Sequence, residues 1–228
     1  MLEIGKFRVI AQEDLVEFFY GGRKARYRPD LENLLRQGLV QIKSIPHEEA
    51  GSRTLLSLTK DGHRFLKASW GTPDDEQALY HGFRKPREAH HDADLYRLYQ
   101  KASDEIARSG GKRLRVVVDE EFKRRIYQEL AKLGDDPQFP EQKRAVAERH
   151  HLQMVRRKIP IPDLRIEYET KDGEKARVDL ELATIHYRGR HLAEKAHAGF
   201  SIYAHAEDRA KLRRILDERE LMAEILSL

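Results

Sequence analysis

The chain contains no cysteine. This absence excludes disulfide bonds, zinc sites built on thiolates and a cysteine nucleophile. The sequence also lacks an apolar run near the roughly 20 residues that a membrane-spanning helix needs. Its first 15 residues lack the apolar core of a signal peptide. We therefore expect a cytoplasmic protein with no membrane partner.

Charged residues of both signs are abundant. The 228 residues include 43 Lys and Arg against 39 Asp and Glu, which gives a formal net charge of +4. Hydrophobic residues make up 39% of the chain, enough to build cores. Because the net charge is small, local clusters of basic residues carry more information than the sum. The balance is compatible with a nucleic-acid partner.

A stretch rich in Gly, Pro and acidic residues at 70–76 is the best candidate for a domain boundary. It follows the apparent end of a helix. We therefore predict a first domain over residues 1–70, a linker over 71–88 and a second domain over 89–228.

The first domain shows the order helix, helix, strand, strand, helix. Gly21 and Gly22 are expected to end the first helix. Pro29 either marks the first turn of the second helix or lies inside a helix that begins earlier. Thr59 is suited to cap the last helix. The expected elements are helices at 12–20, 29–37 and 60–68 and strands at 39–45 and 54–58.

The residues that follow Gly22 form the densest basic cluster of this domain, at the start of the second helix. The cluster consists of Arg23, Lys24, Arg26, Tyr27 and Arg28. The strings Leu34-Leu-Arg-Gln-Gly-Leu-Val40 and Leu58-Thr-Lys-Asp-Gly-His-Arg-Phe-Leu66, in this order, resemble prokaryotic winged-helix domains. The resemblance implies that the cluster contacts double-stranded DNA through phosphates and base edges.

The alternative is a protein-docking module whose basic cluster is only a solvated face. Glu48 and Glu49 at the expected tip of the wing favour this alternative, because they would repel phosphate.

The second domain combines helices with a short strand and a hairpin. The pair Asp172-Gly173 between two alternating apolar runs predicts the hairpin turn. The terminal helix either covers the sheet or forms the seam of a homodimer. The expected elements are helices at 92–108, 120–133, 140–157, 192–203 and 207–226, a strand at 114–118, and hairpin strands at 163–169 and 176–183.

The helix expected over 140–157 and the residue after it are basic. They are either a second phosphate-contact surface or an ordinary charged face. The basic residues are Lys143, Arg144, Arg149, Arg156, Arg157 and Lys158.

Two acids in the hairpin form a candidate metal site. Asp163 begins the first strand and Glu181 lies within the second, so their carboxylates can converge on one Mg²⁺ or Mn²⁺ ion. Such an ion polarises a phosphate and activates a water, and Lys195 on the next helix is placed to assist. The alternative is structural: Pro-Asp commonly begins a strand, and Glu181, beside Asp179, could form surface ion pairs with Arg165 or Arg177.

This arrangement resembles the PD-(D/E)XK nuclease-like fold, with Pro162-Asp163 and Glu181 as its acidic elements. Ala183 stands where the usual lysine would be, and Lys195 is in the place that some branches use instead. The whole chain is similar to the replication-relaxation family of mobile-element proteins, in its Pro162-Asp163 strand, its Leu180-Glu181 strand and its helix carrying Lys195 and Tyr203. Members often carry an acid where this chain has Ala183.

The predicted fold class is therefore α+β or α/β, with a winged helix-turn-helix followed by a PD-(D/E)XK-like mixed sheet with flanking helices. The resemblance implies a DNA-binding accessory protein of plasmid or mobile-element replication or mobilisation. Its nuclease-like domain is either inactive or active, and replication or conjugation proteins are its expected partners. The alternatives are a metal-dependent endonuclease targeted by the winged helix and, more weakly supported, a transcriptional regulator.

Overall fold

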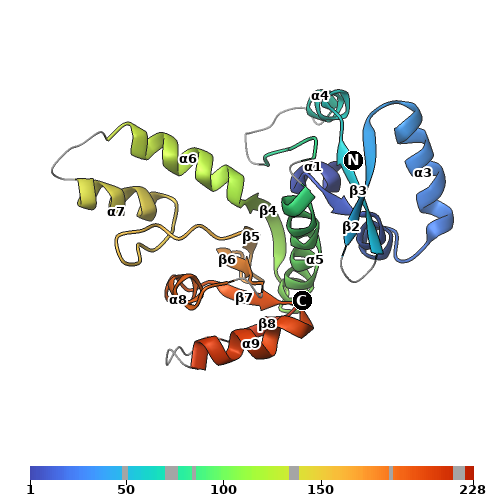
Figure 1. Ribbon diagram of the computed structural model, residues 1–228. Helices are drawn as coiled ribbons and strands as arrows, with labels where there is room; N and C mark the ends of the chain where they lie inside the picture. The colour runs from blue at the N-terminus through green and yellow to red at the C-terminus, as the bar shows by residue number, and fades with distance from the viewer. Residues whose placement is uncertain (48–50, 70–76, 84–85, 134–138, 185–186, 218–223) are drawn as a thin grey trace. The chain divides into compact units, whose positions relative to one another are not determined.

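The chain has a mixed α+β fold (Figure 1) in the computed structural model. The structure describes residues 1–47, 51–69, 77–83, 86–133, 139–184, 187–217 and 224–228. The chain divides into two compact units, Met1–Ala102 and Ser103–Leu228. Among the described residues, no helix has the length and apolar character needed to cross a membrane.

The first unit is built on a three-stranded antiparallel sheet in the order β1-β3-β2. Leu56 in the central strand pairs with Ile10 on one side and with Ile42 on the other. The elements are α1 (Leu2–Phe7), β1 (Ile10–Ala11), α2 (Gln12–Asp14), the π-helix η1 (Leu15–Phe19), α3 (Lys24–Arg36), β2 (Val40–His47), β3 (Gly51–Leu58), α4 (Lys60–Ser69) and α5 (Pro86–Arg108), which continues into the second unit.

A tight turn separates η1 from α3. Gly21 and Gly22 have φ angles of 58° and 75°, which favour glycine, so the chain reverses here as predicted. Pro29 lies inside α3, which confirms the earlier of the two helix starts considered above. The short elements α1 and β1 were not predicted.

Thr59 caps α4 as predicted. Its hydroxyl accepts a hydrogen bond from the backbone N–H of Gly62 at 2.9 Å and donates one to the carbonyl oxygen of Gly38 at 2.6 Å. Gly62 is needed for close packing, because a Cβ at this position would lie 1.9 Å from the carbonyl oxygen of Leu39. The cap and the glycine therefore hold α4 against the start of β2.

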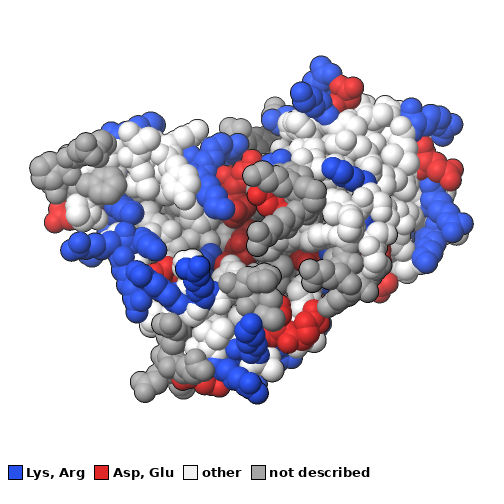
Figure 2. Space-filling model, viewed as in Figure 1, with Lys and Arg blue, Asp and Glu red and all other residues white. Residues whose placement is uncertain are grey.

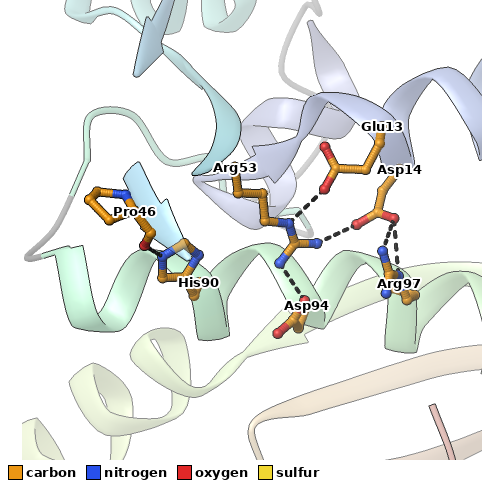
Figure 3. A network of polar contacts seen from close by, with 7 residues as sticks. All are labelled: Glu13, Asp14, Pro46, Arg53, His90, Asp94 and Arg97. Carbon is orange, nitrogen blue, oxygen red and sulfur yellow. Dashed lines mark hydrogen bonds and ion pairs between the residues drawn. The ribbon is translucent and has the colours of Figure 1, made fainter. Parts of the chain in front are cut away.

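A buried charge network joins three elements of the first unit (Figure 3). Arg53 on β3 donates to Glu13 at 2.7 Å, to Asp14 at 2.8 Å and to Asp94 on α5 at 2.6 Å. Arg97 on α5 donates to the other oxygen of Asp14 at 2.7 Å. Arg53 is only 6% exposed, so its guanidinium group has lost most of its contact with water. The three carboxylates compensate for this loss by accepting its hydrogen bonds.

The first compact unit reaches Ala102 and so includes the described part of the linker predicted at 71–88 and the start of the second domain predicted at 89–228. Ala89 and Ala93 of α5 are buried in one apolar cluster with Leu55. Within residues 77–83, the N–H of Tyr80 donates to the carbonyl oxygen of Gly5 at 2.7 Å, so this described part of the predicted linker is bonded to the first unit. The division between the units lies within α5, while residues 70–76 and 84–85 are outside the described residues.

The second unit is built on a five-stranded mixed sheet in the order β4-β5-β6-β7-β8. The first three strands are antiparallel, and β7 and β8 run parallel to β6. The predicted hairpin is present, with Gly173 at φ 82° in its turn. The elements are β4 (Lys112–Val118), α6 (Asp119–Ala131), α7 (Phe139–Arg149), β5 (Leu164–Glu169), β6 (Lys175–Leu182), α8 (Gly189–His197), β7 (Ser201–Ala204), α9 (Ala206–Asp217) and β8 (Ile225–Ser227).

Three of the helices predicted for this unit are shorter than expected. The helix at 192–203 ends at His197, and Gly199 at φ 80° turns the chain into strand β7, so Tyr203 is on a strand. The helix predicted at 207–226 is described over Ala206–Asp217, residues 218–223 lie outside the described residues, and 225–227 form a strand. The helix at 140–157 ends at Arg149, and His151 two residues later has a φ angle of 54°, outside right-handed helical geometry.

Helix α9 covers the sheet, which is one of the two roles predicted for the terminal helix; the other was the seam of a homodimer. Leu212 and Leu216 of this helix pack in one buried cluster with Ile202 of β7 and Ile225 of β8. A second cluster holds Phe122 and Ile126 of α6 with Val146 of α7. The helices thus bury the apolar faces that the sheet and the helical periodicity provide.

Candidate functional site

The predicted basic cluster consists of Arg23, which caps the start of α3, and of exposed residues in the first turns of that helix. All four basic side chains are exposed, and within the described part of the chain none of them forms an ion pair or a side-chain hydrogen bond. They are Arg23, Lys24, Arg26 and Arg28. The turn at Gly21 and Gly22 places them at the N-terminal end of a 13-residue helix, where the helix dipole adds positive potential.

The structure does not support Tyr27 as a DNA contact. Its side chain is 4% exposed, and its ring lies 5.4 Å from that of Tyr20 in an edge-to-face arrangement. It lines an apolar cavity of about 290 Å³ together with Leu31 and Leu34. Residues 27, 31 and 34 share one helix face, so this face packs inward and the basic residues point outward.

The exposed face of α3 has further polar residues that sequence analysis did not single out. Arg36 donates a long hydrogen bond, 3.4 Å, to Asn33, and both are exposed. Figure 2 shows Lys and Arg side chains at both ends of α3 with acidic side chains between them. Arg36 lies four residues after Glu32 and three after Asn33, and this helical spacing is the signal that would have placed Arg36 on the same exposed side.

In the second unit, the sheet register brings the predicted acids together. Leu164 of β5 pairs with Leu180 of β6, so one residue further Asp163 lies opposite Glu181. The backbone N–H of Asp163 donates to Oε2 of Glu181 at 3.3 Å, and Oδ2 of Asp163 accepts from the N–H of Leu182 at 2.9 Å. The two carboxylates thus tie the beginning of β5 to the end of β6.

Lys195 of α8 joins the same cluster. Its Nζ lies 2.7 Å from Oε1 and 2.8 Å from Oε2 of Glu181, and it donates to the carbonyl oxygen of Ile161 at 2.6 Å. The three residues predicted as a site therefore converge. The alternative expected an ion pair between Glu181 and Arg165 or Arg177. Arg165 instead binds Asp179, through two hydrogen bonds of 2.6 and 2.8 Å.

Tyr187 is a member of this cluster that sequence analysis missed. Its hydroxyl donates to Oε1 of Glu181 at 2.5 Å. Glu181 has no exposed surface, so burial raises its pKa, as does the charge of Asp163, while Lys195 and Tyr187 oppose the rise. Burial and the adjacent acids also raise the pKa of the Tyr187 hydroxyl.

A second acid–lysine pair lies beside the cluster. The backbone N–H of Asp119 donates to the carbonyl oxygen of Asp163 at 3.0 Å, and Asp119 forms an ion pair with Lys123 one helical turn later. Although burial alone lowers the pKa of Lys123, Asp119 and then Asp163 raise it. An acid directly after a buried strand was the sequence signal for Asp119.

The cluster does not fit a divalent metal ion as it stands. Both oxygens of Glu181 already accept hydrogen bonds, from Lys195, Tyr187 and the backbone of Asp163. Among the residues that the structure describes, no group of three or more His, Cys, Asp or Glu side chains is arranged to hold a metal. The contacts instead form a closed ion pair that attaches α8 to the sheet.

Part of the basic surface predicted over residues 140–158 is neutralised. Arg149 donates to Glu129 through two hydrogen bonds of 2.7 and 3.1 Å, and His150 lies 2.7 Å from the other oxygen of Glu129. Arg156 and Arg157 lie outside the helix in a tight turn and are exposed.

Comparisons of this chain with protein-family models, with curated proteins and with solved structures found no match. The similarity to the replication-relaxation family therefore stays an expectation from the sequence. The features of the chain that bear on its function are the exposed basic cluster at the start of α3 and the closed Glu181–Lys195 pair.

Proposed function

We propose that the chain binds double-stranded DNA through α3, which would act as the recognition helix of a winged helix-turn-helix. The order α1, β1, α2 with η1, α3, β2, β3 supports this assignment, as does the three-stranded sheet. In such domains one helix enters the major groove while a β-hairpin lies beside it.

The observation that carries the proposal is that α3 buries one side while four basic side chains at its start are exposed. Tyr27 anchors the inner face in the core, while Arg23, Lys24, Arg26 and Arg28 are exposed with no ion-pair partner within the described part of the chain. An exposed guanidinium or ammonium group without an internal partner keeps its full charge for phosphates or base edges. The tip of the hairpin with Glu48 and Glu49 lies outside the described residues.

The test replaces the four basic residues of α3 with Ala and measures binding of labelled duplex DNA by fluorescence anisotropy at several salt concentrations. A matched control removes four exposed charges from the second unit: Lys171, Lys175, Arg213 and Arg214. Because each lost phosphate contact lowers the salt slope by about 0.9, the α3 variant loses affinity and up to about 3.6 of the slope. An α3 variant that binds like the control would refute the proposal.

The role of this binding, in our proposal, is that of an accessory protein in plasmid or mobile-element replication or mobilisation. The second unit would then be a nuclease-like scaffold that contacts replication or conjugation proteins. The closed pair between Glu181 and Lys195 supports a scaffold, because a buried ion pair holds α8 on the sheet without needing a ligand. Co-purification of the full chain with the proteins encoded beside it would test the partner.

The alternative is a metal-dependent endonuclease, favoured by the convergence of Asp163, Glu181 and Lys195. The test incubates end-labelled duplex and single-stranded DNA with the protein and Mn²⁺, beside an Asp163→Asn variant. Cleavage by the wild type alone would establish the nuclease. No cleavage by protein that still binds the DNA would leave the accessory role.

A further inference from the structure

Residues 155–158 form a two-residue hairpin turn on the surface of the second unit. The N–H of Val155 donates to the carbonyl oxygen of Lys158 at 2.8 Å, and the N–H of Lys158 donates back at 2.9 Å. The central residues, Arg156 and Arg157, have φ angles of 49° and 63°. Two consecutive left-handed residues between paired ends define a type I′ turn.

The sequence of this turn is at odds with its backbone. Left-handed φ angles are favourable for glycine and tolerated by asparagine, so type I′ turns strongly prefer Asn-Gly. Long side chains with a Cβ are strained here. Val155 and Ile159 hold the turn in place, because both pack against the apolar cluster of α6 and α7. A strained conformation that its surroundings maintain is typical of a functional position.

The two arginines are exposed, and within the described residues neither has an ion-pair partner. Further basic groups lie beside them. Lys158 lies 3.7 Å from Glu194, which also accepts a hydrogen bond of 3.2 Å from Arg190 on α8. Figure 2 shows Lys and Arg side chains gathered over the segment between α7 and β5 and over α8.

Glu194 organises this patch without neutralising it. Glu194 is 7% exposed. Burial alone would raise its pKa, but the hydrogen bond from Arg190 and the charge of Lys158 lower it below its ordinary value. One acid thus holds two basic side chains, Lys158 and Arg190, while Arg156 and Arg157 extend from the turn with their charges unmatched. The result is a compact basic surface on a rigid base.

We propose that the turn at Arg156 and Arg157, with Lys158 and Arg190, is a second DNA-contact surface that binds the phosphodiester backbone of duplex DNA. This inference rests on the proposed function for the choice of DNA as the ligand. A planar guanidinium group binds phosphate through two parallel hydrogen bonds. The turn presents two such groups, those of Arg156 and Arg157, on a fixed backbone, so binding costs little backbone conformational entropy. Phosphate contacts of this kind add affinity and position the protein without reading sequence.

The experiment replaces Arg156 with Asn and Arg157 with Gly in the full chain. The Asn-Gly turn relieves the backbone strain, so the melting temperature rises by about 2 °C or more. Binding of labelled duplex DNA nevertheless weakens, and the salt slope falls by about 2. An Arg156→Lys, Arg157→Lys variant keeps the slope, and an Arg213→Ala, Arg214→Ala variant controls for loss of two charges elsewhere.

Two results would overturn the inference. One is an Asn-Gly variant that binds duplex DNA with the affinity and slope of the charge control. The other is a loss of binding that is larger on single-stranded RNA than on duplex DNA, which would assign the surface to RNA. The α3 variant distinguishes failure of this inference from failure of the proposed function. The α3 variant weakens DNA binding only if α3 contacts DNA. The turn variant weakens it only if the turn contacts DNA.

Discussion

The Nζ of Lys195 lies 2.7 Å from Oε1 of Glu181, whose carboxylate has no solvent-exposed surface. This pair connects α8 to β6, and Tyr187 completes it by donating to the same oxygen. A buried charge whose partner is removed is strongly unfavourable. A single substitution in this pair should therefore change both the free energy of unfolding of the protein and the protonation of Glu181.

Replacing Lys195 with Met should destabilise the protein by about 3–5 kcal/mol at pH 8, because it leaves the Glu181 carboxylate buried and unpaired. At pH 5 the loss should be smaller, since Glu181 can take up a proton. Urea unfolding at both pH values measures the difference. The Glu181→Gln, Lys195→Met double variant is the control, and its loss should not depend on pH.

Glu181 also predicts how stability depends on pH. Burial first, and then the charge of Asp163, raise the pKa of Glu181 from its ordinary value of 4.5 to about 7 in the folded protein. The folded state therefore binds the proton more tightly than the unfolded state, and this contribution is present below pH 4.5 and lost as pH rises through 7. Relative to wild type, Glu181→Gln should gain stability between pH 5 and pH 8. Parallel stability curves for the two proteins would contradict the shift.

Tyr27→Phe should leave DNA binding unchanged. The Tyr27 hydroxyl is buried and has no hydrogen-bond partner among the described residues, so its removal also leaves stability equal or slightly higher. Anisotropy and thermal unfolding measure the two effects. Arg28→Ala, which changes the adjacent exposed residue, is the comparison, and it should lower affinity without affecting stability. Weaker binding by Tyr27→Phe would restore this residue to the interface.

The charge network in Figure 3 predicts where the first unit ends. A fragment of residues 1–102 should unfold cooperatively, because it keeps Asp94 and Arg97 beside Arg53 and Asp14. A fragment of residues 1–70 lacks these α5 residues and exposes the apolar surface that Ala89 and Ala93 cover. It should be largely unfolded by circular dichroism. A stable 1–70 fragment would return the boundary to the position expected from sequence.

Local chemistry explains which elements sequence analysis predicted. The hairpin at 164–182 was found because Asp172-Gly173 is suited to its turn, and the start of α4 because Thr59 is suited to cap it. Strand β7 was taken for helix, because its four residues become a strand only by pairing with β6 and β8, which lie apart from it in sequence. The extent of the first unit was missed for the same reason, since Arg53 and Asp94 are 41 residues apart.

The site was predicted in part. Asp163, Glu181 and Lys195 do converge, because a hairpin register and a following helix bring such residues to one end of a sheet. That the three form a closed pair with Tyr187, rather than an open metal site, depends on side-chain packing that no spacing reveals. Tyr27 was placed among DNA contacts because of its neighbours in sequence, although its spacing to Leu31 indicates the inner face.

One salt titration decides whether α3 contacts duplex DNA. Full-length wild type and the variant with Arg23, Lys24, Arg26 and Arg28 replaced by Ala are titrated onto the same labelled duplex. The variant should bind more weakly, with a salt slope lower by up to about 3.6, because up to four phosphate contacts are lost. Superimposable titrations for the two proteins, at every salt concentration, would contradict the claim.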